Sequence, residues 1–202
     1  MKKDPSIALV ELNSIAKGIL TSDTMIKNSP VSMIRSGSVH NGKYIILVGG
    51  SVASVDEAYR IGIITAGDSL IDSLFLPEVH ESVFEALSGI RKKCSDECIA
   101  VVETLSVASV IKAADSGIKG ADVEIIEIRI ADDLGGKGLV ILSGKLEEIE
   151  TAAIIIKGLL SEKSSIVDIS IIPRPVTETS EQINNSTNFR DSVPVTVKDG
   201  EK

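Results

Sequence analysis

An internal duplication is the feature that most restricts what this 202-residue chain can fold into. Residues 7–11 (Ile-Ala-Leu-Val-Glu) recur at 99–103 as Ile-Ala-Val-Val-Glu, and Gly42-Lys43 recurs as Gly136-Lys137. The first match has an offset of 92 and the second an offset of 94, so the second copy carries the longer loop before its Gly-Lys pair. Self-similarity on this scale predicts two similar domains. Each has about 90 residues, enough to bury one core.

Both copies predict the same order of elements. The first copy predicts strands at 6–12, 31–39, 44–48 and 70–76, helices that begin near residues 14 and 51, and a short closing helix at 79–89. The second predicts strands at 99–103, 123–130, 139–142 and 166–172 and helices at 106–119 and 146–160. This β-α-β-β-α-β order is the ferredoxin-like split unit, an α/β fold of the α+β kind. Its helices cover one face of an antiparallel sheet, and the other face needs a cover or a partner.

These patterns predict a first domain at 6–90, a charged linker at 91–97, a second domain at 98–176 and a polar tail at 177–202. The tail lacks the apolar residues to form a core of its own. We expect it to be flexible or to lie along another subunit.

Composition excludes several classes of function. A net charge of −8 is the wrong sign for a general binder of nucleic-acid backbones. Aromatic residues make up only 2% of the chain, too few for base-stacking platforms. No apolar run approaches the ~18 residues of a membrane span, and the first residues lack the pattern of a signal peptide. The positive mean hydropathy of +0.24 then predicts burial of apolar surface between subunits in the cytoplasm.

No group of residues indicates catalysis, so we do not expect an enzyme. The two histidines, His40 and His80, lie in no nucleophile–base pattern. Glu11 and Glu103 end equivalent strands, where matched carboxylates are typical of helix caps or interfaces. Two cysteines at the spacing of Cys94 and Cys98 are too few for a closed metal site, and we expect ordinary thiols.

The turn between the second and third strands of each copy is the most distinctive segment. It spans 38–43 in the first copy and 131–137 in the second. Its glycines let backbones approach closely, as loops around a symmetry axis must. An ordinary hairpin is the alternative. Lys27 and Lys119 occupy equivalent helix ends, where a cation is favourable. They also suit an edge contact made twice per chain.

At these residues the chain resembles the shell proteins of bacterial microcompartments, in the tandem-domain class that forms trimers. The resemblance rests on residues 7–18, Asp23–Lys27, Gly42–Gly50 and the closing Ile171–Pro175, and it covers about 6–176 in both copies. The order of elements is the unpermuted one of tandem BMC domains. Within the class, the chain is most similar to the propanediol-utilisation type, which carries an iron–sulfur cluster at its central pore.

The resemblance implies a flat homotrimer whose six domains form a pseudohexagon in the shell, joined to other shell proteins at its edges. It implies edge contacts at Lys27, Lys119 and Arg174. It also implies a central opening for small metabolites, metal or electrons. The loop residues expected at that opening are His40, Asn41, Gly42, Asp132, Asp133, Leu134, Gly135 and Gly136.

His40 stands where the cluster-bearing relative has its ligand cysteine. Iron–sulfur clusters are held mainly by cysteine, so a cluster is disfavoured. Three imidazoles around an axis suit Zn²⁺ or a similar ion if the nitrogens converge to ~2.0–2.1 Å of it. Otherwise they form a protonatable collar, because imidazole changes charge near neutral pH. The carboxylates of Asp132 and Asp133 would favour cations at such an opening.

These observations predict a structural shell tile with a selective or metal-binding pore, located in a microcompartment shell in the cytoplasm. A pair of ferredoxin-like domains that binds a small regulatory ligand is the alternative, because one fold serves many functions.

Overall fold

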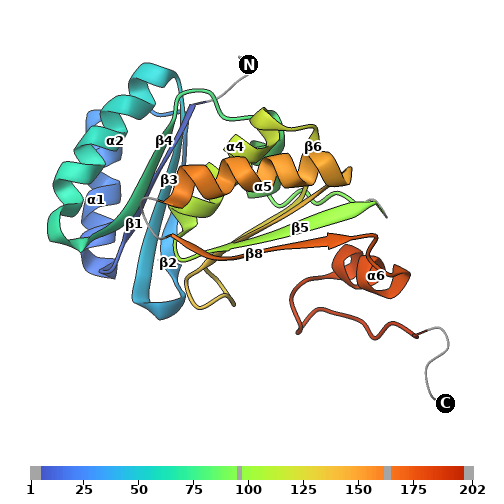
Figure 1. The fold of residues 1–202 in the computed structure, drawn as a ribbon. Coiled ribbons are helices and arrows are strands. Elements are labelled where there is room, and N and C mark those ends of the chain that lie inside the picture. The colour runs from blue at the N-terminus through green and yellow to red at the C-terminus, as the bar shows by residue number, and fades with distance from the viewer. Residues whose placement is uncertain (1–5, 95–96, 162–164, 198–202) are drawn as a thin grey trace.

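The computed structural model describes residues 6–94, 97–161 and 165–197. It contains two four-stranded antiparallel sheets, one from each copy, with strand orders β2-β3-β1-β4 and β6-β7-β5-β8 (Figure 1). This order confirms the ferredoxin-like fold class. Residues 95–96 of the expected linker and 198–202 of the expected tail lie outside the described ranges.

The elements follow the duplicated order. The first copy contains β1 (Ser6–Leu12), α1 (Ile15–Asn28), β2 (Met33–Val39), β3 (Lys43–Gly50), α2 (Val52–Ala66), β4 (Leu70–Leu76) and α3 (Glu81–Leu87), with short 3-10 turns at His40–Gly42 and Gly67–Ser69. The second contains β5 (Cys98–Thr104), α4 (Val107–Gly120), β6 (Val123–Ile130), β7 (Gly138–Gly144), α5 (Leu146–Leu160), β8 (Ile166–Pro173) and α6 (Thr177–Asn185). The predicted strands at 6–12, 70–76 and 123–130 and the helix at 146–160 match these bounds.

The two sheets share one register, which identifies equivalent residues. Leu12 lies opposite Tyr44 in the first sheet, as Thr104 lies opposite Gly138 in the second. Glu11 lies opposite Asp72 on β4, as Glu103 lies opposite Asp168 on β8, and each pair is followed by a register shift. The offsets found in the sequence therefore describe equivalence in space.

The first helix of each copy is exposed to a very different degree. α1 buries Gly18, Thr21, Ser22 and Met25. Its isoleucines at positions 15, 19 and 26, which the sequence places on one apolar face, are 42%, 56% and 47% exposed. α4 buries nine residues on several faces, because the first domain covers one side of it and its own sheet another. The apolar face of α1 is therefore not part of a core within this chain.

The C-terminal segment differs from the expectation of a tail that is flexible or lies along another subunit. Residues 177–185 form α6, which lies on the side of the second sheet opposite α5 (Figure 1). Ile183 packs there against a cluster that contains Cys94, Ile99 and Ile141. Arg91 also donates to the carbonyl oxygens of residues 183–185. The prediction rested on composition, and α6 needs only one apolar residue because it covers a face that is already apolar.

The two cores exchange large and small residues between equivalent positions. Gly18 on α1 lies under Tyr44 on β3, and a Cβ at Gly18 would come within 2.3 Å of the Tyr44 ring. In the second copy the equivalents are reversed, with Val110 on the helix and Gly138 on the strand, where a Cβ would come within 2.4 Å of Val110. The same core position is therefore filled from the strand in the first domain and from the helix in the second.

A second pair behaves in the same way. Gly62 on α2 leaves room for the Met25 sulfur, 2.8 Å from an added Cβ. In the second copy, Gly117 replaces the methionine and Ile156 replaces the glycine, and an added Cβ at Gly117 would come within 3.2 Å of the Ile156 side chain. Because cores are densely packed, neither member of a pair can be changed alone without cost.

Gly18→Val will therefore destabilise the protein by about 1–3 kcal/mol or more, because the new side chain overlaps Tyr44. Adding Tyr44→Gly, which copies the second domain, will recover part of the loss. Urea unfolding of the single and double variants measures the coupling. Gly158→Ala is the control, because a Cβ there meets nothing within 4 Å. Additive losses from the two substitutions would contradict this account.

Candidate functional site: the domain junction and its loops

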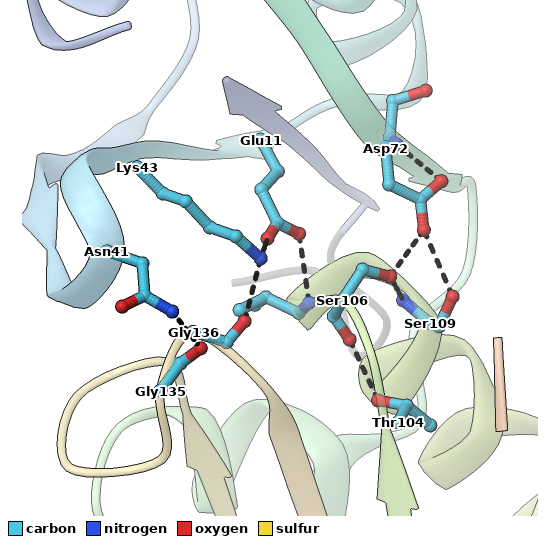
Figure 2. Close-up of polar contacts among 11 residues, drawn as sticks. Glu11, Asn41, Lys43, Asp72, Thr104, Ser106, Ser109, Gly135 and Gly136 are labelled. Atoms are coloured by element: carbon cyan, nitrogen blue, oxygen red, sulfur yellow. Dashed lines mark hydrogen bonds and ion pairs between the residues drawn. The ribbon is translucent and has the colours of Figure 1, made fainter. Parts of the chain in front are cut away.

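The junction between the two domains is built around Glu11, at the end of β1. Its carboxylate is 0% exposed, and its Oε1 lies 2.8 Å from the Nζ of Lys43 (Figure 2). Its Oε2 accepts a hydrogen bond from the backbone N–H of Val107, the first residue of α4, at 2.9 Å. A carboxylate at a helix N-terminus is favourable because the first N–H groups have no partner within the helix. One residue of the first domain thus holds the first helix of the second.

Burial raises the pKa of Glu11 above its ordinary value of 4.5. The ammonium group of Lys43 and the backbone N–H groups of Val107 and Ala108 oppose this shift, because they stabilise the charged form. Desolvation is the largest cause, so the folded protein holds a proton on Glu11 to a higher pH than the unfolded chain does.

Asp72 on β4 makes a second contact with the start of α4. Its Oδ2 accepts from the hydroxyl groups of Ser106 at 2.5 Å and Ser109 at 3.0 Å (Figure 2). Ser106 is also the N-cap of α4, since its Oγ accepts from the Ser109 N–H at 3.2 Å. Thr104 fixes the approach by donating to the Ser106 carbonyl at 2.8 Å. Two adjacent carboxylates of the first sheet therefore bind the first turn of one helix.

The loops that the sequence predicted at a central opening lie together. The Lys43 ammonium donates to the Gly136 carbonyl at 2.9 Å, and the Asn41 amide donates to the Gly135 carbonyl at 2.5 Å (Figure 2). Positive φ angles of 68° at Gly42 and 81° at Gly136 belong to the left-handed region that favours glycine. The two loops are thus one polar cluster, formed by residues 40–43 and 131–137.

His40 is engaged through its backbone and its ring. Its N–H donates to the Asp132 Oδ1 at 3.2 Å, and its ring Nδ1 lies 3.2 Å from the same oxygen. The backbone N–H of Asp133 also points to this Nδ1, at 3.2 Å. A neutral ring accepts from Asp133 through Nδ1, whereas a charged ring donates from Nδ1 to Asp132. In both states Nδ1 is used within the chain, and Nε2 is the nitrogen left for an external ligand.

The C-terminal segment reaches the same cluster. Asn188 donates to the Asp133 Oδ2 at 3.1 Å, and the Arg190 guanidinium lies 4.0 Å from the Asp133 Oδ1. Upstream, Arg129 donates to the Thr187 carbonyl at 3.0 Å. The two loop carboxylates expected to attract cations are therefore partly engaged, Asp132 by His40 and Asp133 by the tail.

The residues expected at the tile edge are separate from this cluster. Lys27 pairs with Asp23 at 2.6 Å on α1. Lys119 pairs with Asp115 at 2.6 Å on α4 and also donates to the Glu78 carbonyl. Arg174 has a φ of 51°, and its N–H donates to the Glu97 carbonyl at 2.7 Å. Their role at an edge stays a prediction.

The sequence did not single out Lys43, Asp72 or Ser106 as site residues. A signal for Lys43 was present, because the Gly-Lys pair is repeated as Gly136-Lys137. Asp72 also has an equivalent, Asp168, but only the sheet register shows that both lie beside the strand-end glutamates.

An iron–sulfur cluster does not fit the residues present. The loop cluster offers imidazole and carboxylate groups but no thiol, and both cysteines are buried elsewhere, at the start of β5 and beneath α6. Burial raises the pKa of the Cys98 thiol, and the charge of Glu150 raises it further. Among the described residues of one chain, no group of three or more His, Cys, Asp or Glu side chains could hold a metal ion.

Comparison with known proteins defines the class. Residues 6–79 and 98–175 each match the BMC domain family. The chain is 36% identical to the bacterial microcompartment shell protein PduT of Citrobacter freundii over 84% of this chain and 92% of that protein. It is 25% identical to the carboxysome assembly protein CcmO of Synechocystis, over 85% of this chain and 62% of the relative.

A solved structure agrees. The crystal structure of a microcompartment protein from Desulfitobacterium hafniense superposes with a TM-score of 0.77 at 37% identity, covering 88% of this chain and 99% of that one. The chain therefore belongs to the BMC-domain family, as a structural shell protein of a bacterial microcompartment with two domains in tandem. These comparisons support the shell role and not the pair of regulatory ligand-binding domains. Within the described residues, no helix is long and apolar enough to span a membrane.

The raised pKa of Glu11 predicts a specific dependence of stability on pH. Because the folded chain keeps the proton to higher pH, the unfolding free energy of the wild type will fall relative to Glu11→Gln as pH rises from about 4.5 to 7. Urea unfolding of both proteins at one fixed concentration measures this difference. Glu57→Gln, at an exposed glutamate on α2 outside the junction between the domains, is the control. A wild-type unfolding free energy that instead rises relative to that of Glu11→Gln as pH increases would show that Lys43 and the helix N–H groups outweigh burial.

Proposed function

We propose that three copies of this chain close into a flat, non-catalytic pseudohexameric tile, which joins other shell proteins and surrounds a central opening with the loop cluster. The observation that carries this proposal is the unequal burial of equivalent helices. Val107 and Ile111 on α4 are 0% exposed. Their equivalents on α1, Ile15 and Ile19, are 42% and 56% exposed.

The contact between the domains explains this inequality. In the contact between the domains, the first domain uses a face of its sheet and the second domain uses its helix α4, so the two contacting surfaces differ. On the second sheet, α6 covers the apolar residues Ile99 and Ile141, while Glu103 and Asp168, the counterparts of the carboxylates that bind α4, stay accessible. On the first domain, the apolar face of α1 stays exposed. Such head-to-tail contacts form a ring when the rotation closes and a filament when it does not. Three chains with six domains supply six such junctions around one centre.

The opening follows from the same arrangement. The loops of both domains meet within one chain beside the first junction, so repeating the junction brings all six loops around the axis. Small polar metabolites are the class of molecule that such a collar of histidine, asparagine and backbone carbonyls would pass. The Nε2 of His40 is the atom that three copies would offer to one metal ion.

A substitution on the exposed face of α1 tests the trimer. Ile19→Asp will convert a particle of about 64 kDa, three times the chain mass of 21.3 kDa, into monomers, because the charge would be buried at the junction. Native mass spectrometry at micromolar concentration measures the mass. Ile64→Asp on α2, where the side chain is 80% exposed, is the control and will stay trimeric. A wild type that is monomeric at these concentrations would contradict the tile.

A metal titration tests His40. If three imidazoles converge, the trimer will bind about one Zn²⁺ per three chains, and His40→Ala will abolish this binding. Calorimetry with metal-free protein measures the stoichiometry. His80→Ala is the control, because His80 accepts from Ser82 at the start of α3 and lies outside the loop cluster. Absence of Zn²⁺ binding, or binding that His40→Ala leaves unchanged, would contradict a metal site at His40.

A further inference from the structure

Each chain carries equivalents of both sides of the internal junction, one on the second sheet and one at the start of α1, and these two sides do not meet within the chain. We infer that a second junction forms between copies, with Asp168 of one copy binding the Ser14 hydroxyl and the Lys17 ammonium of the partner subunit. In the same contact, Glu103 accepts from the partner's Ile15 N–H. This inference rests on the proposed trimer and assigns the groups that close it.

The receiving half lies on the second sheet. Glu103 and Asp168 are neighbours on β5 and β8, as Glu11 and Asp72 are on β1 and β4. Glu103 has the equivalent lysine as its partner, because Lys137 lies 2.7 Å from its Oε1. This pair is exposed, with 36% of the glutamate side chain and 41% of the lysine side chain accessible. The internal pair leaves only 0% and 16% accessible, because α4 covers it.

The donating half lies at the start of α1. Ser14 is the N-cap of α1, and its Oγ accepts from the Lys17 N–H at 3.3 Å. Ser106 caps α4 in the same way while its hydroxyl donates to Asp72. Ser14 can therefore donate to a carboxylate without losing its role as a cap.

One residue distinguishes the two junctions. The second hydroxyl that binds Asp72 belongs to Ser109, and the equivalent position on α1 is Lys17. The internal contact is thus a hydroxyl–carboxylate pair, whereas the contact between copies becomes an ammonium–carboxylate pair. Lys137 completes the contact by donating to the partner's Gly42 carbonyl, as Lys43 donates to Gly136 inside the chain. The closing junction is therefore more ionic than the internal one, and salt will screen it.

Charge reversal tests the pairing of Lys17 with Asp168. Lys17→Asp and Asp168→Lys will each raise the protein concentration at which half the trimer dissociates by at least about tenfold. The double variant will restore the wild-type value. Lys17→Ser, which copies the internal contact, will keep the trimer and weaken its dependence on NaCl. Glu57→Lys, an exposed reversal on α2, is the control. Native mass spectrometry over a dilution series measures each protein.

The outcomes separate this inference from the proposed tile. Trimers unaffected by either reversal, or reversals that the double variant does not rescue, overturn the pairing while the tile stands. A monomeric wild type overturns both.

Crosslinking gives a second readout that does not depend on dissociation. Ser14→Cys with Asp168→Cys will give a disulfide ladder that ends at the trimer on a denaturing gel. Asp72→Cys with Ser106→Cys, at the internal junction, will crosslink within one chain and serves as the positive control. A crosslink in the control without one between copies overturns the inference.

Discussion

A buried carboxylate bonded to the start of a helix sets the relative position of the two domains. Glu11 is removed from water, which costs free energy, and it is kept in place by Lys43 and by the first N–H of α4. Because the bond runs from one domain to the other, the two sheets cannot turn independently. Asp72 makes a second contact with the same helix turn by accepting from the hydroxyl groups of Ser106 and Ser109. The spacing of the loops and the faces left open at either end of the chain follow from this constraint.

The fold could be predicted largely from the sequence because duplication doubles each weak signal. An apolar run at 6–12 is ambiguous alone, yet its recurrence at 99–103 with the same helix pattern behind it defines a domain. Which face of α1 is buried could not be predicted, since periodicity shows that Ile15 and Ile19 share an apolar face but not whether this chain covers it. α6 was missed because its contacts come from Arg91 and the second sheet rather than from its own composition.

The sequence indicates that the two loops are equivalent, whereas the contacts between them could not be predicted. His40 and Asp132 are 92 residues apart in the sequence, and only the duplication indicates that they belong to equivalent loops. The hydrogen-bond partner of each loop carboxylate depends on the strand register and on the longer loop of the second copy. The reversed core pairs could not be predicted either, because the need for glycine at position 18 is seen only once Tyr44 is known to lie against it.

The described part of the C-terminal segment contacts the loop of the second domain through Asp133. Asn188 and Arg190 contact Asp133, and Phe189 between them is 95% exposed. Among the described residues, those after α6 take no part in the core clusters on the helix side of either sheet. Mutations within this segment can therefore alter charge and bulk beside the loop without disturbing the scaffold. In the proposed tile, this segment would set the charge beside one loop of each chain independently of the two domain cores.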